Sequence, residues 1–334
     1  MIGTLLALLV FFALFGIFIT QYVPLWMTDN EAQFTSQTAT SFAQFKSYVD
    51  SQYLIGGPSA LGTPFTLSSS NVPLITQSTQ GTLSFVPTTC PNGFYVPGAK
   101  GETTSNLGQP VSPTYCLFEN ITLSSGPGGS GVFTQHSQSG LLEMQLPNRY
   151  YTQQLFYFEN DAVVESQGNG QEILLAVPPF NVTTVASNTT FVSSLLSITG
   201  NATAVVGQQT EEVFSHLRYS QVVASKGVIS GGVGQPNSLN VTFEIGTPNP
   251  CAWQKFLWSE MNVSGIPYSA TATAGVSSYN WIVPGTTNES IPVANPICTS
   301  PTGYTTILAV DLHYVDYATI FYAGVQLTFG VGGT

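Results

Sequence analysis

The first 28 residues of the chain, MIGTLLALLVFFALFGIFITQYVPLWMT, contain no charged side chain, and Asp29 is the first charged residue. A helix needs roughly 20 apolar residues to cross a bilayer, so this run is long enough. It exceeds the roughly 7–15-residue apolar core of a cleaved signal peptide, and no clear small-residue cleavage site follows it. A buried core helix would not normally be apolar on all sides for this many turns. The segment is therefore predicted to lie in lipid or in an assembly that replaces lipid.

The helical pattern continues beyond this apolar run, although the sequence becomes polar. Apolar residues then recur at spacings of three and four, which is typical of one stripe of an amphipathic helix. Gly56-Gly57-Pro58 is a strong stop signal. We therefore expect one near-continuous helix over residues 1–54, about 80 Å long, with Pro24 as the place of any kink. The stripe consists of Phe34, Phe42, Phe45, Val49 and Tyr53.

The remainder of the chain has a β-like pattern. Short runs rich in Val, Ile, Thr, Tyr and Phe alternate with clusters of Gly, Pro, Asn and Ser, which predicts a mainly β, sandwich-like domain over residues 55–334. A Gly- and Ser-rich stretch at 124–131 either closes a subdomain at 55–130 or forms a long surface loop. Pro250–Met261 is the one helix expected in this domain, with Trp253, Phe256, Leu257 and Met261 facing the core. The predicted strands are Thr82–Val86, Tyr115–Thr122, Leu141–Leu146, Leu155–Phe158, Ala162–Ser166, Glu172–Val177, Phe191–Ile198, Ala202–Val206, Glu211–Val223, Asn240–Ile245, Thr305–Leu312 and a central, buried Tyr317–Phe329.

The charge composition excludes some partners. Only 7% of the residues are charged, and six basic against 17 acidic residues give a net charge of −11. Nucleic acid is not an expected partner, because the chain lacks the residues for a basic patch. The first basic residue is Lys46, so no Lys or Arg closely follows the apolar run. By the positive-inside rule, this absence favours an extracellular location for the C-terminal domain.

Seven Asn-x-Ser/Thr sequons support that location. All lie beyond the N-terminal helix, and none has Pro at the middle position. The pattern is typical of a glycosylated ectodomain, in which N-linked glycans would keep a charge-poor surface soluble. We expect several of the seven to be occupied: Asn120, Asn181, Asn188, Asn201, Asn240, Asn262 and Asn288.

The cysteines are predicted to form disulfides. The four are Cys90, Cys116, Cys251 and Cys298; none forms a C-x-x-C pair, and no His is near them in sequence, so a zinc site is not expected. An even number in an exported domain favours disulfides. Three pairings are possible, and we favour Cys90–Cys116 with Cys251–Cys298 because each closes a local loop.

No catalytic motif is apparent. The chain lacks G-x-S-x-G, H-E-x-x-H and Walker sequences. Asp311, His313 and Asp316 could form half of an acid–base or metal site, but we favour an exposed strand face as the explanation. Glu159-Asn160-Asp161 is the nearest candidate for a calcium site. We therefore expect no enzyme activity, no cofactor and no metal.

A resemblance gives the N-terminal helix a role. Ile2-Gly3-Thr4-Leu5-Leu6, at the start of the apolar run, resembles the N-terminus of archaeal type IV pilins and archaellins. The segment Gln21–Trp26, followed by Asn30-Glu31, is similar to larger archaeal surface proteins that carry such a helix before a β-rich ectodomain. The resemblance implies a helix that is held in the membrane before assembly and then polymerises with copies of itself. Two features depart from the pilin pattern: no Lys or Arg precedes the helix, and the ectodomain is large. The residues implied in assembly are Ile2, Gly3, Leu5, Leu6, Phe11, Phe12, Phe15 and Gly16.

Three functions are compatible with these features. The first is a pilin-like subunit of an extracellular filament for adhesion or surface attachment. The second is a single-pass anchored surface protein that does not polymerise and binds glycans or an S-layer. The third is an anchored extracellular enzyme. Small residues within the apolar helix (Gly3, Ala7, Ala13 and Gly16) allow helices to pack closely, which suits the first function, but membrane anchors carry such residues too.

Overall fold

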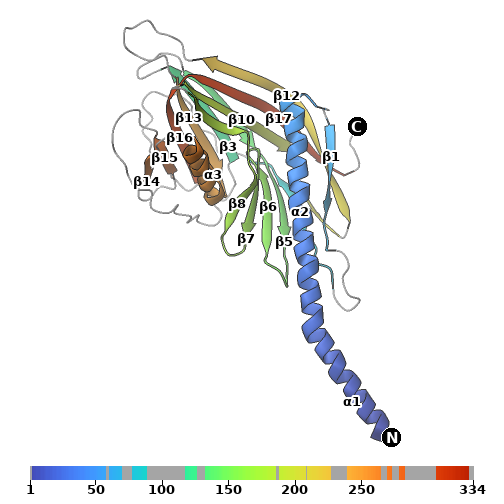
Figure 1. Cartoon of the computed structure of the whole chain (residues 1–334). Helices are drawn as coiled ribbons and strands as arrows, with labels where there is room; N and C mark the ends of the chain where they lie inside the picture. Colours follow the sequence, from blue (N-terminus) through green and yellow to red (C-terminus); the bar gives the residue numbers. More distant parts are fainter. Residues whose placement is uncertain are drawn as a thin grey trace.

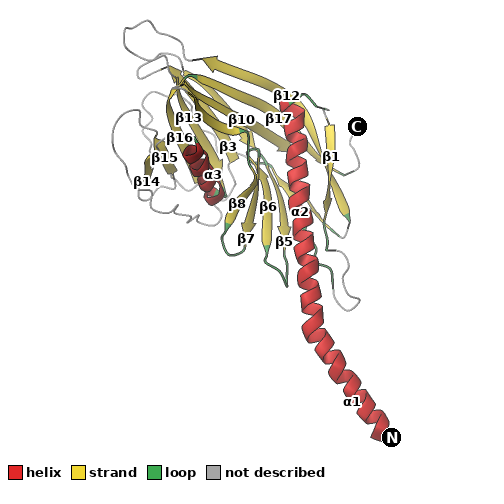
Figure 2. Ribbon diagram, viewed as in Figure 1, coloured by secondary structure: helices red, strands yellow, loops and turns green. Residues whose placement is uncertain are grey.

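The computed structural model describes most of the chain. The described residues are 2–57, 60–69, 77–88, 117–125, 132–185, 188–207, 209–226, 239–264, 269–272, 278–282 and 306–330. Within them the protein is mainly β, with one long N-terminal helix that leads into the β domain (Figure 2). The fold class predicted from the sequence is therefore confirmed.

The N-terminal helix runs without a break from Ile2 to Leu54. It consists of α1 (Ile2–Ile17), a π-helical turn η1 (Phe18–Tyr22) and α2 (Val23–Leu54). Figure 1 shows it leaving the domain as a long projecting rod. Just beyond its end lies Gly56, whose φ of 73° is in the left-handed region that favours glycine. The Gly57 N–H donates to the Ser51 carbonyl across this end (2.9 Å).

The π-helical turn lies directly before Pro24. Proline has no N–H, so it cannot donate to the carbonyl four residues earlier. Here the Val23 N–H donates to the Phe18 carbonyl, one residue further back than in an α-helix. The irregularity expected at Pro24 is thus taken up by a wider turn, which keeps the rod continuous.

The described strands form three sheets. One has the order β1 (Ala60–Thr66), β12 (Thr210–Lys226), β17 (Tyr317–Phe329), β10 (Asn188–Gly200), β9 (Phe180–Val185). The second has the order β11 (Thr203–Val206), β2 (Thr82–Val86), β5 (Leu141–Leu146), β6 (Gln154–Glu159), β7 (Ala162–Gln167), β8 (Glu172–Ala176). The third has the order β14 (Ser269–Ala272), β15 (Ser278–Ile282), β16 (Thr306–Val315), β13 (Leu239–Thr247), β3 (Leu117–Ser125), β4 (Val132–Ser139).

Strand β17 is central in the first sheet, as its sequence predicted, and it contributes to two hydrophobic cores. Ala318 and Ile320 belong to one core, and Val325 and Leu327 to the other. Successive side chains of a strand point to opposite faces. The two cores therefore lie on opposite faces of the β1–β12–β17–β10–β9 sheet.

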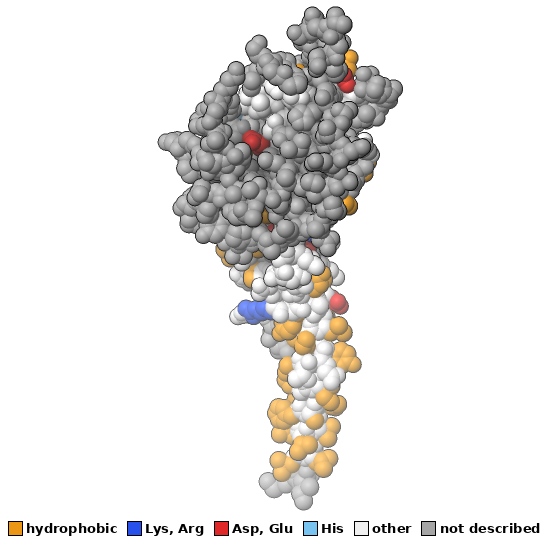
Figure 3. Space-filling model, turned by 90° about the vertical axis from the view of Figure 1, so that its left-hand side faces the viewer, with side chains coloured by type: hydrophobic (Ala, Val, Ile, Leu, Met, Phe, Trp, Pro, Cys, Tyr) orange, Lys and Arg blue, Asp and Glu red, His pale blue; other side chains and the backbone are white. Residues whose placement is uncertain are grey.

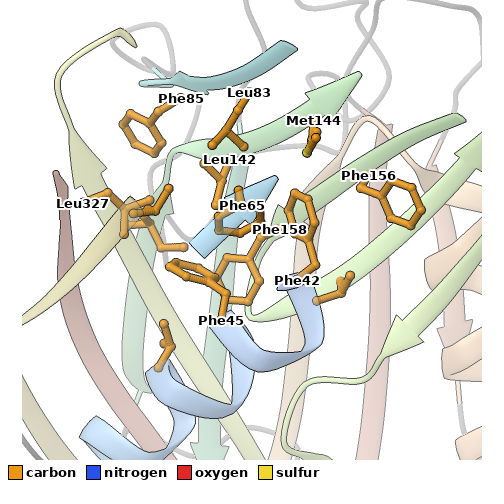
Figure 4. Close-up of a cluster of buried hydrophobic side chains, with 14 of the residues drawn as sticks. Phe42, Phe45, Phe65, Leu83, Phe85, Leu142, Met144, Phe156, Phe158 and Leu327 are labelled. Carbon is orange, nitrogen blue, oxygen red and sulfur yellow. The ribbon is translucent and has the colours of Figure 1, made fainter. Parts of the chain in front are cut away.

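The core that includes Val325 and Leu327, which we call the α2 core, contains the apolar stripe predicted on the N-terminal helix. Phe34, Phe42, Phe45, Val49 and Tyr53 are all buried in it. Figure 4 shows Phe42 and Phe45 projecting from α2 toward Phe65 of β1 and Phe158 of β6. The ring centroids of Phe45 and Phe158 are 5.0 Å apart, and those of Phe42 and Phe65 are 5.1 Å apart, both edge-to-face. The helix thus joins the first sheet to the second.

The second core, the α3 core, is built around α3 (Pro250–Val263), the helix that the sequence predicted in this domain. Trp253, Phe256, Leu257 and Met261 are buried there, as expected, while Trp258 is exposed. They share this core with apolar residues of β9, β10, β13 and β16.

The pairing of the strands corrects the possible subdomain at 55–130. Strand β1 pairs with β12, β2 pairs with β5 and β11, and β3 pairs with β13. The described strands of this segment are therefore distributed over all three sheets and form no unit of their own. Strands β1, β4, β9, β14 and β15 were not predicted.

The packing of α2 predicts the cost of removing one ring. Phe45→Ala should lower the free energy of unfolding by about 3–5 kcal/mol, because Phe45 is fully buried among aromatic rings. Denaturant unfolding of the full chain in detergent would measure this. Phe133→Ala is the control, since Phe133 is 37% exposed on β4. Equal losses in the two variants would contradict the central place of α2 in the core.

Candidate functional site

The projecting half of the helix is the most distinctive surface of the described protein. Among the described residues, the Gly3–Leu54 helix is the one that is long and apolar enough to cross a membrane. Its apolar segment is not buried in the domain. Figure 3 shows hydrophobic side chains around this rod below the domain. The exposed large apolar residues are Leu5, Leu6, Leu8, Leu9, Val10, Phe11, Phe12, Leu14, Phe15, Ile17, Phe18, Ile19, Tyr22, Leu25 and Trp26.

The residues implied in assembly all lie on this free half. Leu5, Leu6, Phe11, Phe12 and Phe15 are 42–67% exposed. The rings of Phe11 and Phe15 stack at a centroid distance of 5.9 Å, and those of Phe18 and Tyr22 stack at 6.0 Å. These four residues follow one another along the helix at spacings of three and four, so they form an aromatic ridge.

Two glycines interrupt the bulky surface. Nothing in the subunit lies within 4 Å of where a Cβ would stand on Gly3 or Gly16. A Cβ at either position would therefore make no contact beyond the neighbouring backbone of its own helix. Gly3 and Ala7, like Gly16 and Thr20, are separated by four residues, the small-xxx-small spacing found where membrane helices approach closely. The side chain of Ile2 lies outside the described residues.

The change from free to packed helix takes place over about one turn. Val23 and Met27 are 4% and 1% exposed, whereas Leu25 and Trp26 on the other side are 63% and 51% exposed. From this level onward one face of the helix belongs to the domain. The projecting half is thus a direct extension of a core element rather than a segment on a loop.

Glu31 fixes the helix to the domain at this level. Its buried carboxylate accepts hydrogen bonds from the backbone N–H groups of Arg149, Tyr150 and Tyr151 at 2.7–3.1 Å. The hydroxyl of Thr79 also donates to it, at 2.5 Å. Several donors to one carboxylate make a strong, charge-assisted attachment between α2 and the β5–β6 loop.

A second polar attachment lies near the other end of α2. The Lys46 ammonium contacts Asp50 at 2.8 Å and the fully buried Asp161 at 3.4 Å. The Tyr53 hydroxyl and the Ser194 hydroxyl also donate to Asp161. Burial alone would lower the pKa of Lys46, but the attraction of Asp161 and Asp50 raises it overall, so the ammonium stays charged. Burial and the nearby Asp161 raise the pKa of Asp50 to about 7.

The candidate calcium ligands, Glu159-Asn160-Asp161, form a buried β-hairpin turn between β6 and β7. Asn160 and Asp161 have φ values of 46° and 58°, as a type I′ turn requires. Glu159 accepts hydrogen bonds from Thr247, Asn249 and the Trp253 indole at 2.6–3.0 Å. Protein donors therefore occupy the carboxylate oxygens of Glu159, whereas the side-chain oxygen of Asn160 is buried without a hydrogen-bond partner. No group of three or more His, Cys, Asp or Glu suited to a metal occurs among the described residues.

The other acid–base candidate, Asp311 with His313 and Asp316, is described only in part. Asp316 accepts a hydrogen bond from the backbone N–H of Thr189 (2.6 Å), which gives it a structural role at the start of β17. The side chains of Asp311 and His313 lie outside the described residues.

The described sequons differ in exposure. Asn181 and Asn201 are exposed and Asn240 is half-buried, whereas Asn120 is fully buried and its Nδ2 donates to Glu244 (2.8 Å). A glycan on that nitrogen is incompatible with the fold, so Asn120 is removed from the expected sites. Both faces of β3 are covered here, which the sequon pattern did not reveal. Asn288 and the side chains of Asn188 and Asn262 lie outside the described residues.

Among the cysteines, Cys251 at the start of α3 is buried and disulfide-bonded. The other three cysteines of the chain, Cys90, Cys116 and Cys298, all lie outside the described residues, so the partner of Cys251 is not described. The pairings Cys90–Cys116 and Cys251–Cys298 therefore stay predictions.

Comparison with protein-family models, with characterised proteins and with solved structures finds no match for this chain. The function has to be argued from the free helix and from the way it is held.

The Glu31 attachment can be tested by amide exchange. Glu31→Ala would leave three backbone N–H groups without their acceptor, a loss of ~1–3 kcal/mol each when such donors are buried. Exchange at residues 149–151 should therefore quicken by about 5- to 150-fold. The control is Asp29→Ala, an exposed carboxylate two residues earlier. Unchanged exchange in Glu31→Ala would show that the loop is held by other contacts.

The buried acids predict the effect of pH on stability. Burial raises the pKa of Glu159 from 4.5 to about 7, although three donors oppose the shift. Its proton is therefore bound more tightly in the folded than in the unfolded chain. This stabilisation is full below the unfolded pKa and is lost as the pH rises through about 7, and it amounts to a few kcal/mol, on the order expected for such a shift.

The midpoint of thermal unfolding should consequently rise as the pH falls from 8 to 5, to which the raised pKa values of Asp50 and Glu119 also contribute. Glu159→Gln should reduce this dependence, and Glu165→Gln, a half-buried acid on β7, should preserve it. A domain that is more stable at pH 8 than at pH 5 would contradict the expected direction.

Proposed function

We propose that the chain is a pilin-like structural subunit of an extracellular filament that serves adhesion or surface attachment. The N-terminal helices of many copies would bundle into the filament core, and the β domains would form its outer layer. Before assembly, the same helix would hold the subunit in the membrane.

The observation that carries this proposal is the continuity of the helix. Its first half is apolar on all sides and free, while its second half is fixed in the α2 core and by Glu31. A simple anchor needs only a flexible connection to its domain. In a filament, by contrast, the position of each helix in the bundle must determine the position of each domain outside it, which a rigid connection provides.

The energetics require some apolar environment for the free half. Burying one Leu, Ile or Phe side chain is worth roughly 1.5–3 kcal/mol, so the exposed side chains from Leu5 to Trp26 together represent tens of kcal/mol relative to water. Lipid and neighbouring helices satisfy this requirement about equally. Packing at small residues such as Gly3 and Gly16 would then decide whether helices associate.

The outer domain suits an extracellular filament surface. The chain has few charges, and glycans at Asn181 and Asn201, both exposed, would supply hydration. These features support export and apply equally to the second candidate, a single-pass anchored surface protein that does not polymerise. The length of the free helix favours that candidate as much as the first.

Gly16→Leu distinguishes the two candidates. The new side chain has free space within the subunit, so the domain should fold normally, but it would overfill a close contact between helices. Filaments should be lost while membrane insertion, measured by alkaline extraction, is retained. Gly16→Ala is the matched control and should still form filaments visible by negative-stain microscopy.

Wild-type protein that occurs only as dispersed membrane monomers would contradict the filament and leave the anchored candidate. Filaments of normal yield from Gly16→Leu would contradict close packing at this glycine.

A further inference from the structure

We propose that the β5–β6 loop and the adjoining turns of the helix form a collar that docks on the headgroup layer of the membrane. The collar consists of Arg149, Tyr150 and Tyr151 from the loop, and Tyr22 and Trp26 from the helix. The expected occupant is the phospholipid interface, with the tyrosine and tryptophan rings among the headgroups and Arg149 on a lipid phosphate. The proposal rests on the membrane-held stage of the proposed function.

Backbone contacts place the loop beside the helix at one level. Glu31 accepts the N–H groups of Arg149, Tyr150 and Tyr151, and the Thr28 hydroxyl donates to the Tyr150 carbonyl at 3.4 Å. The loop therefore lies at the level of residues 28–31. Trp26 and Tyr22 lie about 3 and 9 Å from Thr28 along the helix axis, toward the N-terminus, at a rise of 1.5 Å per residue.

These contacts use the backbone and leave the side chains free. Tyr150, Tyr151, Trp26 and Tyr22 are 43%, 38%, 51% and 60% exposed. Arg149 is exposed as well, and the described salt bridges do not include it. Figure 3 shows basic atoms where the domain meets the apolar rod. Tyr, Trp and Arg, each with an apolar body and a polar end, are the residues that favour the membrane–water interface.

The length of the free helix matches this placement. The segment from Ile2 to Gln21 precedes the collar on the helix. It contains about 20 residues and spans about 30 Å as a helix. That is the approximate thickness of the hydrocarbon core of a bilayer. With the helix inserted, the collar would thus lie at the headgroups, and the domain would rest directly on the membrane.

The charge at the collar suits headgroup phosphate rather than a strongly anionic surface. Asp29 is exposed on the helix close to the loop, so its negative charge offsets the positive charge of Arg149 and the net charge of this region is small. A single guanidinium can still bind phosphate through paired N–H groups. We therefore expect docking on zwitterionic as well as anionic phospholipids.

Hydroxyl-radical footprinting can test the collar in the full chain. The protein is inserted into nanodiscs of phosphatidylcholine and phosphatidylglycerol in equal amounts, and tyrosine oxidation is read by mass spectrometry. Tyr219 and Tyr317 are internal controls, because they are 43% and 42% exposed on the first sheet. Tyr150 and Tyr151 should be oxidised several-fold more slowly than these two. Equal rates in the inserted protein would overturn the collar and leave the proposed function intact.

Failure of the chain to enter nanodiscs would overturn the collar together with the membrane stage of the proposed function. A combined variant, Arg149→Gln with Tyr150→Ser and Tyr151→Ser, tests whether the loop holds the domain down. It keeps the N–H groups that Glu31 binds, so slow amide exchange at 149–151 would show that the loop is still folded. Oxidation of Trp26 should rise several-fold in this variant but not in Tyr219→Ser. Unchanged Trp26 oxidation would overturn the docking role of the loop.

Discussion

The packing of the α2 phenylalanines holds two sheets of the β domain together and also fixes the free apolar half of the helix to that domain. Phe34, Phe42 and Phe45 fill the space between two sheets, so the sheets would face a void without the helix. The same helix continues, without a linker, into the apolar rod. Folding of the domain and presentation of the rod are therefore one process, and a subunit cannot orient one independently of the other.

The polar interior gives this packing its specificity. The turn at Glu159–Asp161 lies where α2, α3, β10 and β13 meet, and its oxygens are bound by Lys46 and Tyr53 from one helix and by Trp253 from the other. Charged groups paired in a low-dielectric interior tolerate few alternative arrangements, because any shift would leave a charge without its partner. The turn thus fixes the positions of α2 and α3 relative to each other.

Much of the fold could be predicted from local patterns, because the apolar stripe of α2, the two terminal strands and α3 all show their periodicity over many residues. Strand β1 could not, since Pro64 argues against a strand and only its place at a sheet edge allows it. The attachment residues Glu31 and Lys46 were missed for another reason: a charged residue on a helix is normally solvated. Two of their partners, the loop at residues 149–151 and Asp161, also lie more than 100 residues away in the sequence. The buried turn has a local sequence signal, Asn-Asp between two predicted strands, which is typical of a tight turn as well as of a metal site. The role of the free helix remains a proposal, since exposure alone does not say what covers it.

The π-helical turn adds a geometric consequence to the continuity of the helix. One extra residue in a turn rotates everything N-terminal to it by about 100° relative to a regular helix. Phe18–Tyr22 lies between the fixed half and the free half, so this turn sets which side of α1 faces the same way as the domain. The Thr20 hydroxyl donates to the Gly16 carbonyl at 2.8 Å, which supplies a partner for backbone near the irregular turn. The direction of the aromatic ridge and of Gly16 relative to the β domain is therefore built into the backbone before any neighbour or lipid is met.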